Sequence, residues 1–236
     1  YTQMLVESQS LQSSGDSSVS GIQAIKQIPA SLQDMLMSRL DRIDCDLSVV
    51  QLGATIGRGF TWELIRASSS LDESALQAEL EKLVRAELLV MHGRAPRHRY
   101  QFKHALLQDA AYSSLVKARR QEYHGRIAEA LESSFPDVCE KEPEVLAQHF
   151  MEASQWEKAA EFWKRAGERS LKRYAYREAI QQLRSGLESL KELPETRDRH
   201  QREIELHVML GVPLQSIVGY SAPAVEENYA RAFALR

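Results

Sequence analysis

The chain has 236 residues, of which 43% are hydrophobic and 27% charged, and its formal net charge is −3. This balance is typical of a globular protein and argues against a disordered or fibrous one. The small negative charge gives no general attraction to nucleic acid or to anionic membranes. The sequence shows neither the run of roughly 20 apolar residues that spans a bilayer nor a signal peptide. The two cysteines, Cys45 and Cys139, form no C-x-x-C motif, so we expect a cytoplasmic protein without disulfides or structural zinc.

The ends of the sequence lie in helical patterns, at Tyr1 and at Arg236, so we expect a fragment of a larger protein. Residues 8–27 are rich in Ser and Gly and predict a loop. Residues 31–43 predict a helix, because Ser31 begins a capping-box-like pattern and apolar residues follow at helical spacing.

The region from residue 46 to residue 102 combines helices with one hairpin. A helix is expected over residues 46–56, a short one around Trp62, and a longer one that Asp72 caps. The pattern then changes to a strand over residues 88–93, a turn over residues 94–99 and a returning strand through Tyr100 and Phe102. Two or three helices followed by a hairpin predict a winged-helix domain.

The rest of the chain predicts helices only, so the fold class is mainly α. The expected helices are 104–117, 120–134, 144–153, 156–174, 176–192, 197–211 and 222–235. Trp163 and Gly167, then Ala179, Leu183 and Gly186, match the spacing of one 34-residue tetratricopeptide unit. Leu210 and Gly211, followed by Tyr229 and Ala232, form a weaker second copy. A generic array of helical hairpins fits this pattern nearly as well, and both interpretations stay open.

Catalytic motifs are absent from the sequence. It contains no P-loop, no H-E-x-x-H, no G-x-S-x-G and no G-x-G-x-x-G, so we expect no enzyme activity in this chain itself. The seven histidines do not cluster in the sequence. Glu203 and His207 share a helix face, but one such pair cannot close a metal site, and we expect a solvated pair and no metal.

The helix after Asp72 argues against DNA binding by the winged helix. It carries five acidic residues against Lys82 and Arg85, and a duplex would repel it. Basic residues gather instead around the hairpin and the helix after it, at Arg94, Arg97, Arg99, Lys103 and His104 and again at Lys117, Arg119, Arg120 and Arg126. A basic wing beside a helix N-terminus suits a small anion such as a nucleotide phosphate, and the alternative is a solvated hairpin.

Five segments in order resemble one known family. They are IPASLQDMLMSRLDRI (28–43), QLGATIGRGF (51–60), LEKLVRAELLV (80–90), YQFKHALLQDAAYSSL (100–115) and LAQHFMEASQWEKAAEFWKRAG (146–167). These resemble the segment that follows the ATPase core in large bacterial STAND-type ATPases, which are fused to class III adenylate/guanylate cyclase or transcription-regulator domains. The resemblance implies the end of the ATPase lid plus a loop at residues 1–27, a winged-helix domain with trailing helices at 28–136, and tetratricopeptide-like repeats at 137–236.

The resemblance also implies a function. The parent protein would bind ATP or ADP with Mg²⁺ on a P-loop core in the same chain, and the repeats would receive a protein or small-molecule activator. Lys103 and His104 are similar in position to the M-H-D motif of NB-ARC ATPases, whose histidine contacts the ADP β-phosphate, although Ala105 stands where that motif has Asp. The histidine could instead cap its own helix or bond a backbone carbonyl.

Four aromatic residues complete the predicted sites. Trp156, Trp163, Tyr174 and Tyr176 could line a partner-binding groove of the repeats, and packing between helices is the expected use of most of them. Two alternative functions remain: an interaction scaffold without a nucleotide role, and a DNA-binding transcription regulator.

Overall fold

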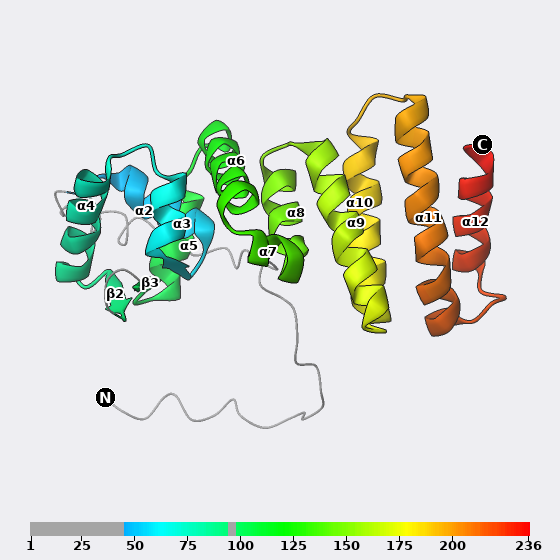
Figure 1. Cartoon of the computed structure of the whole chain (residues 1–236), viewed down its shortest axis with the longest axis horizontal. Helices are drawn as coiled ribbons and strands as arrows, with labels where there is room; N and C mark the ends of the chain where they lie inside the picture. Colours follow the sequence, from blue (N-terminus) through cyan, green and yellow to red (C-terminus); the bar gives the residue numbers. More distant parts are fainter. Residues whose placement is uncertain (1–44, 94–97) are drawn as a thin grey trace, which may run out of the picture.

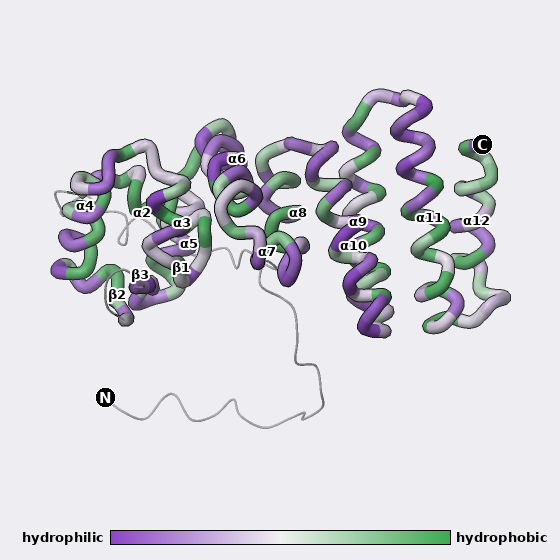
Figure 2. Tube along the Cα trace, in the orientation of Figure 1, coloured by the Kyte–Doolittle hydropathy of each residue, from purple (hydrophilic) through white to green (hydrophobic). Residues whose placement is uncertain are grey.

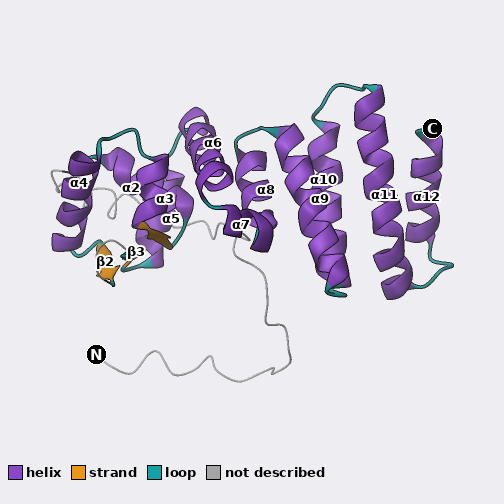
Figure 3. Ribbon diagram, viewed as in Figure 1, coloured by secondary structure: helices purple, strands orange, loops and turns teal. Residues whose placement is uncertain are grey.

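The computed structural model describes residues 45–93 and 98–236. The predicted loop over residues 8–27, the predicted helix over residues 31–43 and most of the predicted turn over residues 94–99 lie outside the described residues. Within them the chain is mainly helical, with one small antiparallel sheet (Figure 3). The prediction of a mainly α fold is therefore confirmed.

Side-chain caps begin the first three described helices. These are α2 (Leu47–Ile56), α3 (Trp62–Ser68) and α4 (Glu73–Arg85). The side chains of Asp46, Thr61 and Asp72 accept hydrogen bonds from backbone N–H groups in the first turn of each helix, and these bonds satisfy donors that have no partner inside a helix. All three helices were expected from the sequence, and Asp72 is the cap that was predicted.

The sheet has three strands, one more than the sequence predicted. Strands β2 (Leu89–His92) and β3 (Arg99–Phe102) form the expected hairpin, and β1 (Gly59–Thr61) pairs with the other side of β3, giving the order β1-β3-β2. A three-residue strand is too short for alternation to show in the sequence. Its central residue, Phe60, is buried and stacks on Tyr100 with ring centroids 5.8 Å apart.

Four helices follow the sheet: α5 (Ala105–Ser113), α6 (Lys117–Ser134), α7 (Pro136–Lys141) and α8 (Pro143–Glu152). Two predicted bounds were wrong here: the helix expected over 104–117 ends at Ser113, and the one expected from residue 120 begins at Lys117. The six residues of α7 were not predicted, and they bury no side chain completely.

The remaining helices form a row of antiparallel neighbours (Figure 1): α9 (Trp156–Lys172), α10 (Tyr176–Lys191), α11 (Arg197–Val218) and α12 (Pro223–Ala234). Helix α11 extends beyond the predicted end at residue 211 and contains Pro213. A proline usually ends a helix because it lacks an N–H donor. Here Pro213 and Leu214 are both buried, so packing holds the last two turns in helical form.

The buried apolar residues form two clusters. The larger one contains residues of the sheet and of α2 to α9, and the smaller one joins α10, α11 and α12 around Leu183, Leu206 and Leu210. Helices carry hydrophilic and hydrophobic residues side by side along the row (Figure 2), as expected for amphipathic helices that pack on one face. The larger cluster crosses the boundary predicted at residues 136 and 137, because Leu146, Phe150 and Phe162 belong to it.

Candidate functional site

His104 lies at the junction of β3 and α5. Its backbone is extended and its carbonyl accepts the Leu107 N–H at 3.1 Å, so it is the N-cap residue of α5. Its imidazole makes no capping hydrogen bond and is exposed to solvent. The first N–H groups of a helix have no partner inside the helix and favour an anion. The imidazole therefore stands beside an anion-favouring helix end.

Lys103 is already paired. Its Nζ lies 2.5 Å from Oε2 of Glu87, which follows the end of α4. Both side chains are well exposed, so the ion pair contributes little stability and can exchange for another anion. A phosphate at this junction would compete with Glu87 for the Lys103 ammonium group.

The four predicted partner-binding aromatics fall into different environments. Trp163 is only 8% exposed and packs in the core, which is the use that the sequence also allowed. Trp156 is half-buried at the start of α9. Tyr174 is 78% exposed, and its ring meets that of Tyr176 edge to face with centroids 6.2 Å apart. The structure therefore brings two of the four together, in the turn between α9 and α10.

A buried histidine pair was missed by the sequence interpretation. Nδ1 of His124 on α6 lies 2.8 Å from Nδ1 of His149 on α8, and Nε2 of His124 lies 3.0 Å from the hydroxyl of Tyr112 on α5. Both imidazoles are buried. The two histidines are 25 residues apart in sequence, so no local spacing identifies the pair. This chain of hydrogen bonds, the His124 cluster, joins α5, α6 and α8.

The Nδ1–Nδ1 contact of the His124 cluster requires at least one neutral imidazole. A hydrogen bond between two Nδ1 atoms needs one N–H and one lone pair, and a doubly protonated pair has only donors to offer. Burial, together with the electrostatic effects of His149 and Arg120, lowers the pKa of His124 to about 3. Burial also lowers the pKa of His149 to about 4. Both rings are therefore uncharged at neutral pH.

The expectation of a solvated Glu203–His207 pair was wrong. The Glu203 side chain is 8% exposed and that of His207 is 12% exposed, because α12 packs over this face of α11. Glu203 Oε1 accepts Arg231 Nε at 2.8 Å, and Arg199 lies 4.0 Å from the other carboxylate oxygen. The periodicity of a helix can be read from its own sequence, but that sequence does not show which other helix packs over a given face.

Asn228 fixes the orientation of the His207 ring. The Asn228 amide nitrogen donates to the His207 carbonyl at 2.8 Å, so its amide oxygen must accept from His207 Nδ1, also at 2.8 Å. The imidazole therefore carries a proton on Nδ1 and turns Nε2 toward Glu203, 3.9 Å away. We call Arg199, Glu203, His207, Asn228 and Arg231 the Glu203 cluster.

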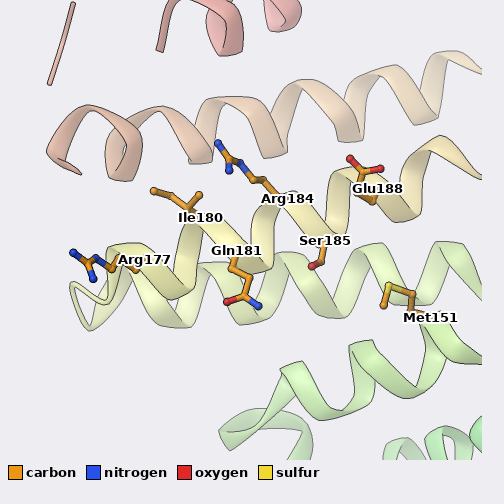
Figure 4. A pocket seen from close by; sticks show the side chains of 7 residues that line it. All are labelled: Met151, Arg177, Ile180, Gln181, Arg184, Ser185 and Glu188. Carbon is orange, nitrogen blue, oxygen red and sulfur yellow. The ribbon is translucent and has the colours of Figure 1, made fainter. Parts of the chain in front are cut away.

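Two open cavities border the outer face of α10. One, of about 560 Å³, lies between the end of α8, at Met151, and the α10 residues from Arg177 to Glu188 (Figure 4). The other, of about 480 Å³, lies between α10, α11 and α12 and is lined in part by Glu203 and Arg231. Arg184 and Glu188 line both cavities, so the two cavities adjoin along α10.

Residues 45–93 and 98–236 contain neither a metal-holding cluster nor a membrane-spanning helix. In that part of the chain no three His, Cys, Asp or Glu side chains come together in a way that would hold a metal ion. The same residues contain no helix with the length and apolar character needed to cross a bilayer.

Comparisons with known proteins give one distant relative. A protein of Rhizobium meliloti (strain 1021), described as uncharacterized, is 26% identical to this chain over 201 residues. The match covers 85% of this chain and 20% of the relative, so the chain spans about a fifth of the length of that relative. No family model matches the sequence, and no solved structure matches the fold.

Proposed function

We propose that this chain is the regulatory segment of a STAND-type signalling ATPase, in which a winged helix reports the nucleotide state of a P-loop core to helical repeats and to an effector such as a nucleotide cyclase. The core and the effector would belong to a longer chain. The observation that carries the proposal is the His104 imidazole at the N-terminus of α5, which is exposed and makes no capping hydrogen bond in the part of the chain that the structure describes.

Strand topology supports the winged-helix part of the proposal. The elements follow the order helix, short strand, helix, helix, hairpin, and the first strand completes the sheet beside the last. Phe60, Tyr100 and Phe102 bury the inner face of this sheet against the helices. The hairpin then leads directly into α5, which places His104 at the base of the wing.

Close helix approaches support the tetratricopeptide-like part. A Cβ on Gly167 would lie 2.5 Å from Cδ2 of Leu183, and one on Gly211 would lie 2.1 Å from the Tyr229 hydroxyl. Gly167 and Leu183 occupy the two positions that the repeat spacing assigned to one unit, and Gly211 and Tyr229 belong to its weaker copy. Helical hairpins built on such contacts stack into arrays that bind partners.

The proposed mechanism is electrostatic. A terminal phosphate at the start of α5 would receive an N–H from His104, backbone N–H groups from the first helical turn, and the Lys103 ammonium in exchange for Glu87. The contact would hold the winged helix against the nucleotide-bearing core. Because the His124 cluster ties α5 to α6 and α8, movement of α5 would be transmitted to the first helices of the array.

The test uses the longer protein with its nucleotide core. His104→Ala should weaken ADP binding about tenfold, which corresponds to the loss of one charge-assisted hydrogen bond with its helix-end partners, and it should raise basal output. The matched control is His92→Ala, which removes an exposed imidazole from β2. Unchanged ADP affinity and unchanged basal output in His104→Ala would show that the sensor role is wrong.

The DNA-binding alternative finds no support in the helix that would enter the groove. On α4, Lys82 pairs with Glu79 at 2.7 Å and Arg85 pairs with Glu81 at 3.2 Å. Both bases of this helix thus already face carboxylates, and the electrostatic attraction that dominates DNA binding has the wrong sign.

A further inference from the structure

The turn between α9 and α10 holds a non-glycine residue in a left-handed conformation. Tyr174 has φ 58°. Its N–H donates to the Leu171 carbonyl at 3.0 Å, and the Ala175 N–H donates to the Ser170 carbonyl at 2.9 Å. These two bonds define a Schellman motif, whose left-handed position is usually glycine because a Cβ is strained there. A glycine at residue 174 would form the same turn without that strain.

Three described turns hold a residue other than glycine at positive φ, and in two of them its side chain bonds to another part of the fold. Glu87 (φ 57°) binds the ammonium group of Lys103, and the hydroxyl of Ser154 (φ 58°) accepts a hydrogen bond from Gln121 at 2.7 Å. Tyr174 is 78% exposed, and its ring meets that of its neighbour Tyr176 edge to face. Strain that persists at an exposed side chain points to a role outside the fold.

Four cations surround the two tyrosines: Arg169, Lys172, Arg173 and Arg177. Within the described residues none of the four side chains has an ion-pair or hydrogen-bond partner. Over residues 168–178 these four positive charges face two acids, Glu168 and Glu178, which leaves a net charge of +2. A helix dipole favours cations at the end of α9, but it disfavours Arg177 in the first turn of α10.

The cationic surface continues into a groove. Arg177 lines both the turn and the cavity of about 560 Å³ on the outer face of α10. Figure 4 shows Arg177 at one end of this cavity, Ile180 and Arg184 further along α10, and Met151 of α8 toward the other end, near Ser185 and Glu188. The groove thus combines the guanidinium groups of Arg177 and Arg184 with aliphatic side chains, and its remaining lining is Gln181, Ser185 and the carboxylate of Glu188.

We propose that the α9–α10 turn and this groove form a docking site for an acidic segment of a protein partner, with carboxylates on the cations and an apolar side chain over Ile180 and Met151. Exposed Tyr and Arg are the residues that most often dominate protein–protein affinity. The two tyrosine rings meet at 82°, so they do not form parallel platforms for stacked bases, and the aliphatic groove wall suits a side chain better than a nucleobase.

This proposal specifies the chemistry of the partner that binds the repeats, and in that respect it rests on the function proposed above. Its test needs neither nucleotide nor an ATPase core. Loss of the His104 effect would leave peptide binding intact, and loss of peptide binding would leave the His104 effect intact, so the two proposals fail separately.

The experiment measures the fluorescence anisotropy of a labelled peptide rich in Glu, Asp and Leu as this chain is added. We expect binding that weakens with salt, because exposed charge pairs are screened. Tyr174→Gly should weaken the affinity by about tenfold or more, as loss of an interface hot spot does. Arg177→Gln should weaken it by about threefold, the scale of one exposed ion pair.

Arg197→Gln is the matched control, since it removes an exposed arginine from the start of α11, at the opposite ends of the helices from the α9–α10 turn (Figure 1). It should leave the affinity unchanged. A peptide that fails to bind, or that binds the Tyr174→Gly variant equally well, overturns the proposal. Tighter binding of oligothymidylate, or of phosphatidylserine vesicles, by the same residues also overturns it and would assign the surface to nucleic acid or to membrane.

Thermal unfolding of the same variant gives an independent readout. Because glycine relieves the left-handed strain, Tyr174→Gly should raise Tm by about 2 °C while it removes binding. Glu87→Gly and Ser154→Gly relieve the same strain but lose a side-chain contact, so their Tm should rise less. A lower Tm in Tyr174→Gly would show that the tyrosine serves the fold, and the docking role would fall with it.

Discussion

The His124 cluster and the Glu203 cluster both bury polar side chains between helices, and they satisfy them in opposite ways. His124, His149 and Tyr112 are neutral and share hydrogen bonds among α5, α6 and α8. The carboxyl group of Glu203 lies between the guanidinium groups of Arg199 and Arg231, and the contact with Arg231 joins α11 to α12. The neutral cluster avoids the cost of burying charge, whereas the charged one must balance that cost with partners.

The two clusters are sensitive to different changes, one to acid and the other to loss of a carboxylate. Acid weakens the neutral cluster, because burial disfavours a charged imidazole and a doubly protonated pair cannot form the Nδ1–Nδ1 hydrogen bond. The charged cluster depends on one carboxylate that three other residues share.

Removal of the shared carboxylate should have the largest effect. Glu203→Ala leaves Arg199 buried and without its carboxylate partner, and loss of one member of a buried ion pair costs about 3–5 kcal/mol of unfolding free energy. Urea denaturation monitored by circular dichroism measures this loss. Glu205→Ala is the control, because that carboxylate is 42% exposed and pairs with Lys164, and it should cost less than about 1 kcal/mol. Equal losses in the two variants would contradict the cluster's role.

Acid should break the neutral cluster next. The pKa values of His124 and His149 lie near 3 and 4 in the folded chain, below the ordinary value of 6.5. The unfolded chain therefore binds more protons, and stability present above pH 6.5 is lost as pH falls toward 4. The loss is on the order of 1 kcal/mol per pH unit for each histidine.

A double variant isolates this acid effect from that of the carboxylates. Replacement of both histidines by leucine removes the two titrating groups and fills their places with apolar side chains. The free energy of unfolding, measured by urea denaturation between pH 7 and pH 5, should fall more steeply for the natural chain than for the variant. Parallel pH profiles would mean that the imidazoles titrate normally.

Local chemistry explains which features the sequence predicted. Asp46 and Asp72 carry their capping signals within three residues, and α9 and α10 carry an apolar face of their own, so these elements were predicted correctly. The strand β1 was missed because its three residues gain their partner only from β3, about forty residues later. His124 and Glu203 were missed or misplaced for the same reason, since they are buried by helices that lie elsewhere in the chain.

The predicted site residues also have some features that the sequence predicted and others that it could not. The sequence singled out His104 and Tyr174 by residue type and by resemblance, and the structure shows both exposed, one at a helix start and one at a strained turn. The strain at Tyr174 could not be predicted, because a left-handed φ at a tyrosine is the exception that side-chain sterics disfavour.

A close contact at a glycine brings the two helices of the α9–α10 hairpin together. Gly167→Ala would place a Cβ 2.5 Å from Cδ2 and 2.7 Å from Cγ of Leu183, and such overpacking costs about 1–3 kcal/mol. Gly59→Ala is the control, because its Cβ would meet nothing closer than 3.5 Å. The same urea titration measures both. A Gly167→Ala variant as stable as the control would mean that the two helices can move apart.

The smallest expected effect concerns His104, whose imidazole, unlike those of His124 and His149, has no hydrogen-bond partner within residues 45–93 and 98–236. Asp72 and His104 are both N-cap residues, but of the two side chains only that of Asp72 accepts a backbone hydrogen bond, from Ala75 at 2.9 Å. Asp72→Ala should therefore cost about 1 kcal/mol, and His104→Ala less than about 0.5 kcal/mol. Urea denaturation of both variants gives the comparison. A large loss in His104→Ala would show that the imidazole supports the fold, and any change in nucleotide binding would then have a structural cause. A small loss leaves ligand contact as the reason for such a change, because the imidazole makes no capping hydrogen bond within the described part of the chain.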